Sequence, residues 1–374
     1  MQSAIMIMEK GGIMNFEILS KPRVIMSNPY SKHNYFGWPS VVKTHDGRII
    51  IGASGFRLDH ICPFGKGVIA FSDDEGKSFT EPLPVIDTVL DDRDVGLCTF
   101  GEKGIIVTSF NNTRKMQRYH ANYQSDSIKN YINSYLDTVT DEEEREAIGS
   151  TFRISLDAGI TFSKIYKSPV SSPHGPYELS DGTVMWAGYV FNTEERAEGF
   201  VEHLEVYTIN TANAQMDFVG RIPDINENGK HITPSEPYMI ELSDGTLLCH
   251  IRTEENFSSY QSVSYDKGKT WSVPERLLSD FGGAPCHILK HSSGILCSLY
   301  GFREAPYGIK AMFSADNGKT WDTDNFLYVN GVCADLGYPC SVELNDGSIF
   351  TVFYAKKSFD SPCEIFGFIW RIVK

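Results

Sequence analysis

Four copies of one eight-residue signature recur along the chain and constrain its fold more than any other feature. Each copy reads Ser-x-Asp-x-Gly-x-Ser/Thr-Phe/Trp, and the copies occupy residues 72–79, 155–162, 264–271 and 314–321. Asp side chains hydrogen-bond back to the backbone of a tight turn, and Gly allows positive φ there. The closing aromatic residue is suited to burial between neighbouring sheets. The signature therefore predicts a recurring hairpin turn, as in an array of similar β units.

A second repeat, offset from the first, gives the number of units. Short hydrophobic strands pass through a glycine turn at six places: Gly47, Gly104, Gly182, Gly245, Gly294 and Gly347. The third unit has lost the signature, and in the sixth unit the sequence ends before the place where a signature would stand. A unit of roughly 50 residues has room for four strands, which is one blade of a β-propeller.

We therefore predict an all-β fold, a single six-bladed β-propeller domain over residues 1–374. Residues 14–26 are expected to supply an extra strand beside the strand-like C-terminal run, 364–374. Such pairing closes the ring and hides its edge strands.

One long interruption lies in the second unit, at about 113–149. It is polar, and five apolar or aromatic residues in it have helix-like spacing: Tyr119, Tyr123, Ile128, Ile132 and Leu136. We predict a helical insertion that packs on the blade surface or, alternatively, forms a lid over the central pocket or an oligomer contact.

Composition and charge exclude several classes of function. The net charge of −14 and the absence of a Lys/Arg cluster argue against nucleic acid as a partner. The eight cysteines have no metal-ligand spacing, so neither a zinc site nor a disulfide framework is expected. No segment is long and apolar enough to suggest a membrane span. The N-terminal residues do not make a secretory signal, which favours a cytoplasmic chain, or a secreted or periplasmic one if a signal has been removed. The oligomeric state stays open.

The segments that lead into the innermost strand of each blade are the places to look for a site, because they border the central channel. They lie upstream of each turn glycine, at 36–40, 91–96, 173–177, 234–238, 283–287 and 336–340. Five contain Pro, which suits rigid backbone at a rim. Their polar side chains are Arg93, Asp94, His174, Glu236, His287 and Tyr338.

Three further arginines end hydrophobic strands in three different blades: Arg57, Arg252 and Arg303. Guanidinium groups hold carboxylates with paired hydrogen bonds, so the three together suggest an acidic small-molecule ligand. Alternatively, each pairs with a neighbouring Asp or Glu in a salt bridge.

The signatures resemble the Asp-box (BNR) repeats of sialidases (neuraminidases), and the resemblance covers all six units. The run SEPYMIELSDGTLLCHIR, 235–252, is similar to the family segment that holds a glutamate partner of the nucleophile and a carboxylate-binding arginine. The resemblance thus implies these roles for Glu236 and Arg252. It implies a second carboxylate-binding arginine at Arg303 and the nucleophilic tyrosine at Tyr338, in GYPCSVELNDGSIFTVFY.

For the general acid, the resemblance implies Asp59 in FRLDHICPFGKG, with Asp94 as the alternative, and Arg57 matches a family arginine near this loop. A tyrosine, with a pKa of about 10, is a weak nucleophile until a carboxylate takes its proton. Sialidases are the tyrosine exception among retaining glycosidases, because their anomeric carbon bears a carboxylate. We therefore expect an exo-acting, retaining glycosidase that releases a terminal acidic sugar and needs no metal or cofactor.

One position departs from the family pattern. Sialidases open their first blade with Arg-Ile-Pro, whose arginine is one of three that hold the carboxylate, whereas this chain has Gly37-Trp38-Pro39. Either Arg57 or Arg93 replaces the missing cation, or the substrate is not an ordinary sialoside. Trp38 offers an apolar face to a sugar ring, or else belongs to the core.

Two other functions remain open on the same scaffold. One is a lyase or hydrolase of uronic-acid glycans, in which proton transfer uses His60, His174, His287 and Tyr338. The other is a propeller that binds glycans or proteins without catalysis, for which the missing arginine is the best argument.

Overall fold

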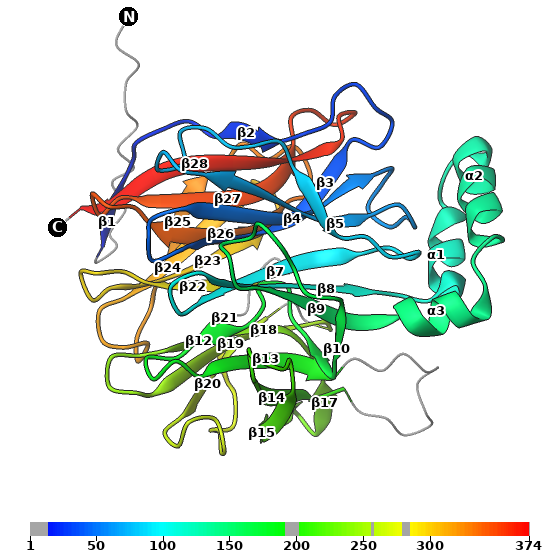
Figure 1. The fold of residues 1–374 in the computed structure, drawn as a ribbon. Coiled ribbons are helices and arrows are strands. Elements are labelled where there is room, and N and C mark those ends of the chain that lie inside the picture. The colour runs from blue at the N-terminus through cyan, green and yellow to red at the C-terminus, as the bar shows by residue number, and fades with distance from the viewer. Residues whose placement is uncertain (1–13, 191–201, 256–257, 279–284, 374) are drawn as a thin grey trace, which may run out of the picture.

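The computed structural model describes residues 14–190, 202–255, 258–278 and 285–373, and it shows the six-bladed β-propeller that the repeats predict (Figure 1). Each blade is an antiparallel sheet in which consecutive strands are neighbours, except that the two short strands at the start of the third blade both pair with the strand that follows them. The polar insertion of blade two forms three helices at one end of the ring.

The first three blades follow one another along the chain. Blade one contains β3 (Tyr35–Lys43), β4 (Ile49–Arg57), β5 (Lys66–Ser72) and β6 (Leu83–Ile86). Blade two contains β7 (Arg93–Phe100), β8 (Gly104–Asn111), β9 (Gly149–Ser155) and β10 (Tyr166–Ser168). Blade three contains β11 (Val170–Ser171), β12 (Tyr177–Glu178), β13 (Val184–Val190), β14 (Leu204–Ile209) and β15 (Met216–Ile222).

A small hairpin of β16 (Ile225–Glu227) and β17 (Lys230–Ile232) precedes blade four. Blade four contains β18 (Pro234–Glu241), β19 (Leu247–Thr253), β20 (Ser259–Ser264) and β21 (Glu275–Leu278). Blade five contains β22 (His287–Lys290), β23 (Leu296–Phe302), β24 (Gly308–Ser314) and β25 (Asp322–Tyr328).

Blade six joins the two ends of the chain, as the sequence predicts. It contains β26 (Gly337–Glu343), β27 (Ile349–Lys356) and β28 (Cys363–Val373). The N-terminal strands β1 (Asn15–Ile18) and β2 (Arg23–Met26) both pair with β28, so they complete the blade from outside. The ring is therefore closed by hydrogen bonds between residues far apart in sequence.

The four signature copies form the same turn between the third and fourth strands of their blades. In each copy the serine Oγ accepts a hydrogen bond from the glycine backbone N–H, at 2.8–2.9 Å. The aspartate Oδ1 accepts from the N–H four residues later, at 2.8–2.9 Å. The glycines have φ of 76° to 85°, which requires their conformational freedom. The closing aromatic then packs between blades, as Phe79 does on Phe350, with ring centroids 5.8 Å apart.

The first turn of each blade follows the glycine pattern, with one difference in blade two. Gly47, Gly245, Gly294 and Gly347 have positive φ in the turns between the first two strands of their blades, and Gly182 has positive φ in the turn between β12 and β13. In blade two, however, the positive-φ glycine is Gly101, and Gly104 is the first residue of β8. The predicted turn is thus displaced by three residues, because two glycines flank it and only one takes the left-handed conformation.

The insertion consists of α1 (Arg114–Ala121), α2 (Asp126–Leu136) and α3 (Asp141–Ala147). It packs on the loop after β4, and the buried contact consists of Cys62, Ala121, Ile132 and Leu136. The predicted periodicity is correct for α2 but wrong for Tyr119 and Tyr123, which are exposed. The helix ends at Ala121 and a new one begins at Asp126, so the two tyrosines do not continue the buried face of α2.

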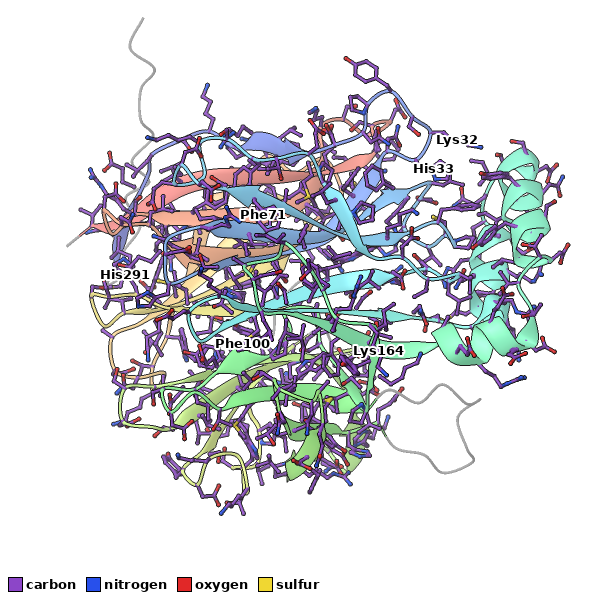
Figure 2. The ribbon with its side chains drawn as sticks, viewed as in Figure 1. Lys32, His33, Phe71, Phe100, Lys164 and His291 are labelled. Atoms are coloured by element: carbon purple, nitrogen blue, oxygen red, sulfur yellow. The ribbon has the colours of Figure 1, made fainter. Side chains whose placement is uncertain are left out.

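The helices mark the face of the ring at which the inner strands begin. Figure 2 shows Lys32 and His33, which precede β3, on the helix side, and His291, in the turn after β22, on the opposite side. Loops of blades one and two meet on this helix side, where Arg93 Nη1 donates to the backbone oxygen of His60. None of the helices described is long and apolar enough to cross a membrane.

Candidate active site

Four blades present a side chain from the same strained position of the inner strand. Trp38, Asp94, Glu236 and Tyr338 have φ of 52°, 44°, 48° and 51°. Strand pairing shifts register at each of these residues, so each is the extra residue of a bulge. A bulge re-aims one side chain, and left-handed backbone in a non-glycine residue is a strain that functional sites tolerate.

Blade three has Gly175 (φ 80°) at the same place before Pro-Tyr. In the blade-five segment 283–287, residues 283–284 lie outside the described part of the chain.

Tyr338 and Glu236 form the centre of the site. The Tyr338 hydroxyl donates a hydrogen bond to Glu236 Oε1 at 2.5 Å, and Arg252 Nη1 donates to Glu236 Oε2. Burial and then the negative charges of Glu236 and Asp94 raise the pKa of Tyr338 well above its usual value. The phenol is therefore neutral until a base removes its proton, and Glu236 is already in contact with that proton.

Arg252 and Arg303 both lie beside Tyr338. The Arg303 guanidinium is 5.5 Å from the centre of the Tyr338 ring. Its Nε donates to the backbone oxygen of Leu336 and its Nη2 to Tyr354 Oη, each at 2.9 Å. Arg252 also lies 3.6 Å from Glu254. Two cations fixed by hydrogen bonds thus lie near the Tyr338 phenol.

Asp94 is a buried carboxyl in the same cluster. Burial raises its pKa to about 7, against the positive charge of Arg93 and with the help of the negative charge of Glu236. Its Oδ1 is buried without a hydrogen-bond partner among the described residues. A carboxyl of this pKa is partly protonated at neutral pH, as a general acid must be.

Asp59 lies farther out, on the loop between β4 and β5. Its Oδ2 accepts a hydrogen bond from Gln124, in the connection between α1 and α2. The two candidate acids of the sequence analysis are therefore in different settings, Asp94 buried near Tyr338 and Glu236 and Asp59 at the rim under the helical insertion.

Arg57 does not take the position that the sequence suggested. In blade four, Arg252 pairs with Ser235, which directly precedes the bulge residue Glu236. In blade one, the residue before the bulge is Gly37, and it pairs with Ser54. Ser54 therefore has the place in blade one that Arg252 has in blade four. Arg57 lies three residues later and is 0% exposed. Its guanidinium forms an ion pair with Asp91 at 2.6 Å.

The rest of the Arg57 head group bonds the backbone oxygens of Asp59 and His60, at 3.2 and 2.9 Å. The expectation that Arg57 binds substrate is thus corrected by its burial. It anchors the loop that carries Asp59.

Aromatic residues fill the space at Gly37. A Cβ atom there would lie 3.3 Å from the Tyr35 ring and 3.7 Å from the Tyr354 ring. Trp38 is 1% exposed, and its ring lies 4.1 Å from the Arg93 guanidinium and 4.8 Å from the His60 ring. Arg93 therefore stacks on Trp38 and does not occupy the place beside Gly37, and Trp38 is a core residue beside the channel and not an open sugar platform.

His174 and His287 lie in the interior of the ring. Their ring centroids are 5.2 Å apart, and His287 stacks on Tyr238 at 4.7 Å. Burial lowers the pKa of His287 to about 3, and burial together with His287 holds the pKa of His174 well below its usual value. Both rings are buried, as Tyr338 and Asp94 are, and both are neutral at ordinary pH.

Sequence reasoning missed three residues that shape the site: Tyr35, Tyr354 and Asp335. Asp335 accepts hydrogen bonds from Tyr35 Oη at 3.0 Å and from His60 Nδ1 at 3.2 Å. The blade repeat could have identified Tyr354. It pairs with Gly337, just before the bulge residue of blade six, as Arg252 pairs with Ser235, just before the bulge residue of blade four. Tyr35 and Asp335 come together only in the folded ring, 300 residues apart in sequence.

Residues 134–352 match the family model of the BNR repeat-like domain. A crystal structure of a protein of unknown function from Dyadobacter fermentans has a TM-score of 0.74 at 18% identity, covering 96% of this chain and 99% of that one. The NanB sialidase from Streptococcus pneumoniae has a TM-score of 0.65 at 12% identity, covering 94% and 70%. An α-L-arabinanase from Penicillium chrysogenum has a TM-score of 0.56 at 12% identity, covering 92% and 97%. No curated protein sequence matches the chain significantly.

Proposed function

The chain belongs to the BNR repeat-like domain family of the sialidase superfamily, and from this premise we propose that it is an exo-acting, retaining glycoside hydrolase that releases a terminal acidic sugar. The observation that carries the proposal is the 2.5 Å hydrogen bond from Tyr338 to Glu236 Oε1, with Arg252 on the other carboxylate oxygen. A structural tyrosine has no need of a carboxylate that is itself fixed by an arginine. A nucleophile that must lose its proton needs both.

In the first step Tyr338 Oη attacks the anomeric carbon while Glu236 takes the phenolic proton. The bond to the leaving-group oxygen breaks, and Asp94, protonated in part of the molecules at neutral pH, gives that oxygen its proton. The product of this step is a glycosyl-tyrosine. Water then attacks the same carbon, the Asp94 carboxylate takes the water proton, and Tyr338 leaves and recovers its proton from Glu236. Two displacements at one carbon retain its configuration.

Arg252 and Arg303 support an acidic sugar as the substrate. Both positive charges act on the tyrosine that would attack, so a carboxylate on the anomeric carbon would lie near two cations. Tyr35 and Tyr354, and not a third arginine, fill the space at Gly37. We therefore propose a sialic acid or a related sugar whose carboxylate needs only two arginines.

The lyase alternative receives less support. It requires a histidine that takes up a proton, and burial lowers the pKa of His60, His174 and His287, which makes each a weaker base. A propeller that only binds glycans or proteins would not need the Tyr338–Glu236–Arg252 arrangement or the four strained bulges.

The test is a panel of fluorogenic glycosides of sialic acid, other ulosonic acids, uronic acids and arabinose. We expect turnover of at least one acidic glycoside, its loss in Tyr338→Phe, and an NMR-detected first product with the configuration of the substrate. No turnover of any glycoside would contradict the proposal. Turnover of arabinosides alone would replace the acidic sugar by a neutral one.

A further inference from the structure

His60 and Asp335 form a hydrogen-bonded pair at the edge of the candidate active site. His60 follows the candidate acid Asp59 on the loop between β4 and β5, and Asp335 lies in the connection before β26. His60 Nδ1 donates a hydrogen bond to Asp335 Oδ1 at 3.2 Å, although 275 residues separate the two. Their side chains are 44% and 25% exposed. The pair therefore joins blade one to blade six and is within reach of solvent.

Asp335 brings a negative charge close to Arg303, which we expect to hold the sugar carboxylate. The next residue, Leu336, accepts a hydrogen bond from Arg303 Nε through its backbone oxygen, at 2.9 Å. Arg303 Nη2 also donates to Tyr354 Oη, at 2.9 Å. Burial raises the pKa of Tyr354 well above its usual value, against the charge of Arg303 and with the help of that of Asp335. The carboxylate of Asp335 is thus within electrostatic reach of the group that Arg303 holds.

His60 lies where blade one departs from the arginine pattern. Its ring is 4.8 Å from the ring of Trp38, the bulge residue of that blade. Its Nδ1 is also 3.1 Å from Tyr35 Oη, and the Tyr35 ring would lie 3.3 Å from a Cβ atom at Gly37. Trp38 is buried, so His60 is the more open of the two side chains here. A partly exposed imidazole thus stands beside the position at which the family pattern has an arginine.

Asp335 carries a negative charge at all but strongly acidic pH. Its partial burial opposes ionisation, yet hydrogen bonds from His60, Cys363 and Tyr35 hold the pKa of its carboxyl well below the usual value. The Tyr35 hydroxyl donates at 3.0 Å and the Cys363 thiol at 3.3 Å. A carboxylate that accepts several hydrogen bonds is stabilised in its charged form. Asp335 is therefore an anion throughout the neutral and mildly acidic range.

His60, in contrast, changes its charge in mildly acidic solution. Burial and the positive charges of Arg93 and Arg57 lower its pKa below the usual histidine value, although the hydrogen bond to Asp335 and the charge of Asp335 act in the opposite direction. On the same loop, Asp59 accepts a hydrogen bond from the helical insertion. His60 is therefore neutral at neutral pH and gains its charge below about pH 6.5. The pair as a whole carries one negative charge above this range and is neutral below it.

We propose that His60 and Asp335 form a protonation-dependent switch that sets how tightly the site binds an acidic sugar. When His60 is neutral, the charge of Asp335 repels the sugar carboxylate beside Arg303. When His60 is protonated, the two charges of the pair cancel and this repulsion is lost. Binding of the acidic sugar is then coupled to the uptake of a proton by His60. The inference rests on the proposed function, because it places the sugar carboxylate at Arg303.

The test measures the binding of N-acetylneuraminic acid and of its methyl ester, which lacks the negative charge, by titration calorimetry at about pH 5 and about pH 7.5. Neither compound has a glycosidic bond that could be cleaved. Because Asp94 also changes its charge near pH 7, all proteins carry Asp94→Asn. In this reference protein we expect the acid to bind about tenfold more tightly at the lower pH, with uptake of a proton, and the ester to bind equally at both pH values.

Two substitutions should act in opposite directions. His60→Gln leaves the charge of Asp335 uncancelled, so the acid should bind weakly at both pH values. Asp335→Asn removes that charge, so the acid should bind tightly at both. Damage to the packing of the loop would instead weaken binding in both variants. His45→Gln, at an exposed position in the turn between β3 and β4, is the matched control and should keep the pH dependence of the reference protein.

Absence of binding in the reference protein, or equal binding of the acid at the two pH values, would overturn the inference, and so would weaker binding in both variants. These outcomes are distinct from a failure of the proposed hydrolysis. If no glycoside is turned over but the acid binds as described, the hydrolysis fails and the switch stands. If acidic glycosides are turned over while the binding of the acid does not change with pH, the hydrolysis stands and the switch fails.

Discussion

The phenol of Tyr338 donates its proton to Oε1 of Glu236 across 2.5 Å, although 102 residues separate the two in the sequence. Both occupy left-handed bulge positions at the start of the inner strands of their blades. The blade repeat brings these positions to the channel, and the bulge aims their side chains at each other.

In the proposed mechanism Glu236 takes the proton of Tyr338. We expect Glu236→Gln to lower kcat/KM about 10²- to 10⁴-fold, since this is the range that a positioned general base supplies. Glu254→Gln is the control, because Glu254 also lies near Arg252 but is about half exposed. Similar losses in the two variants, measured by steady-state kinetics, would mean that Glu236 acts only by neutralising Arg252.

The pKa of Asp94 determines the pH dependence of the proposed activity. If Asp94 is the acid, kcat/KM falls as pH rises through about 7, where the carboxyl loses its proton. Asp94→Asn should abolish this fall of kcat/KM with rising pH. It should also lower kcat/KM more for glycosides with poor leaving groups than for aryl glycosides. Asp59→Asn should keep the fall of kcat/KM with rising pH. If Asp59→Asn abolishes the fall and Asp94→Asn keeps it, the general acid is Asp59.

The same pKa affects folding, with a sign that can be worked out. Asp94 is raised from 3.8 to about 7, so the folded protein binds more protons than the unfolded chain between these values. The free energy of unfolding that this group contributes is therefore present below about pH 4 and decreases towards pH 7. Asp94→Asn should gain stability relative to the wild type as the pH is raised from 5 to 8 in urea titrations. A constant difference across this range would contradict the raised pKa.

The two classes of arginine should respond differently to substitution. Arg303→Gln should raise KM for the acidic sugar by about one to two decades with little change in Tm, because one charged hydrogen bond to a carboxylate is lost. Arg57→Met removes the nearer ion-pair partner of the fully buried Asp91 and leaves only Arg93, at 3.7 Å. Breaking a buried pair in this way costs about 3–5 kcal/mol of unfolding free energy, measurable by urea denaturation. Normal stability of Arg57→Met would restore Arg57 as a candidate ligand contact.

The signature turns should matter for stability alone. The buried Ser314 Oγ accepts from the Gly318 N–H at 2.8 Å and donates to Asp316 Oδ1 at 2.8 Å. Ser314→Ala should lower the free energy of unfolding by about 1–2 kcal/mol. The corresponding change Ser264→Ala should cost a similar amount, because that turn has the same bonds. A change in KM in either variant would show that these turns reach the site.

The fold was predictable because its determinants are local and repeated. The signature fixed the turn between the third and fourth strands, and the turn glycines fixed the start of the second strand in every blade except blade two, where Gly101 takes the place expected for Gly104. The register then identified the lead-in segments that bring Glu236 and Tyr338 together. The proline after each of these residues marks the bulge in the sequence itself.

The properties that could not be predicted depend on contacts between blades. Nothing in the residues near Arg57 reveals that Asp91, from the next blade, neutralises it. The filling of the space at Gly37 requires Tyr35 and Tyr354 from blades one and six to meet. The raised pKa of Asp94 follows from its burial in the folded ring, which one sequence position cannot show.

The central claim is that Tyr338 forms a covalent bond with the sugar, and trapping that intermediate tests it most directly. The protein is incubated with a fluorinated acidic glycosyl fluoride, which forms the glycosyl-enzyme quickly and hydrolyses slowly, and is then digested for peptide mass spectrometry. We predict a mass increase of one sugar on the peptide that contains Tyr338, absent in Tyr338→Phe. Turnover of the parent glycoside with the sugar attached to another residue, or with inversion and no adduct, would contradict the account.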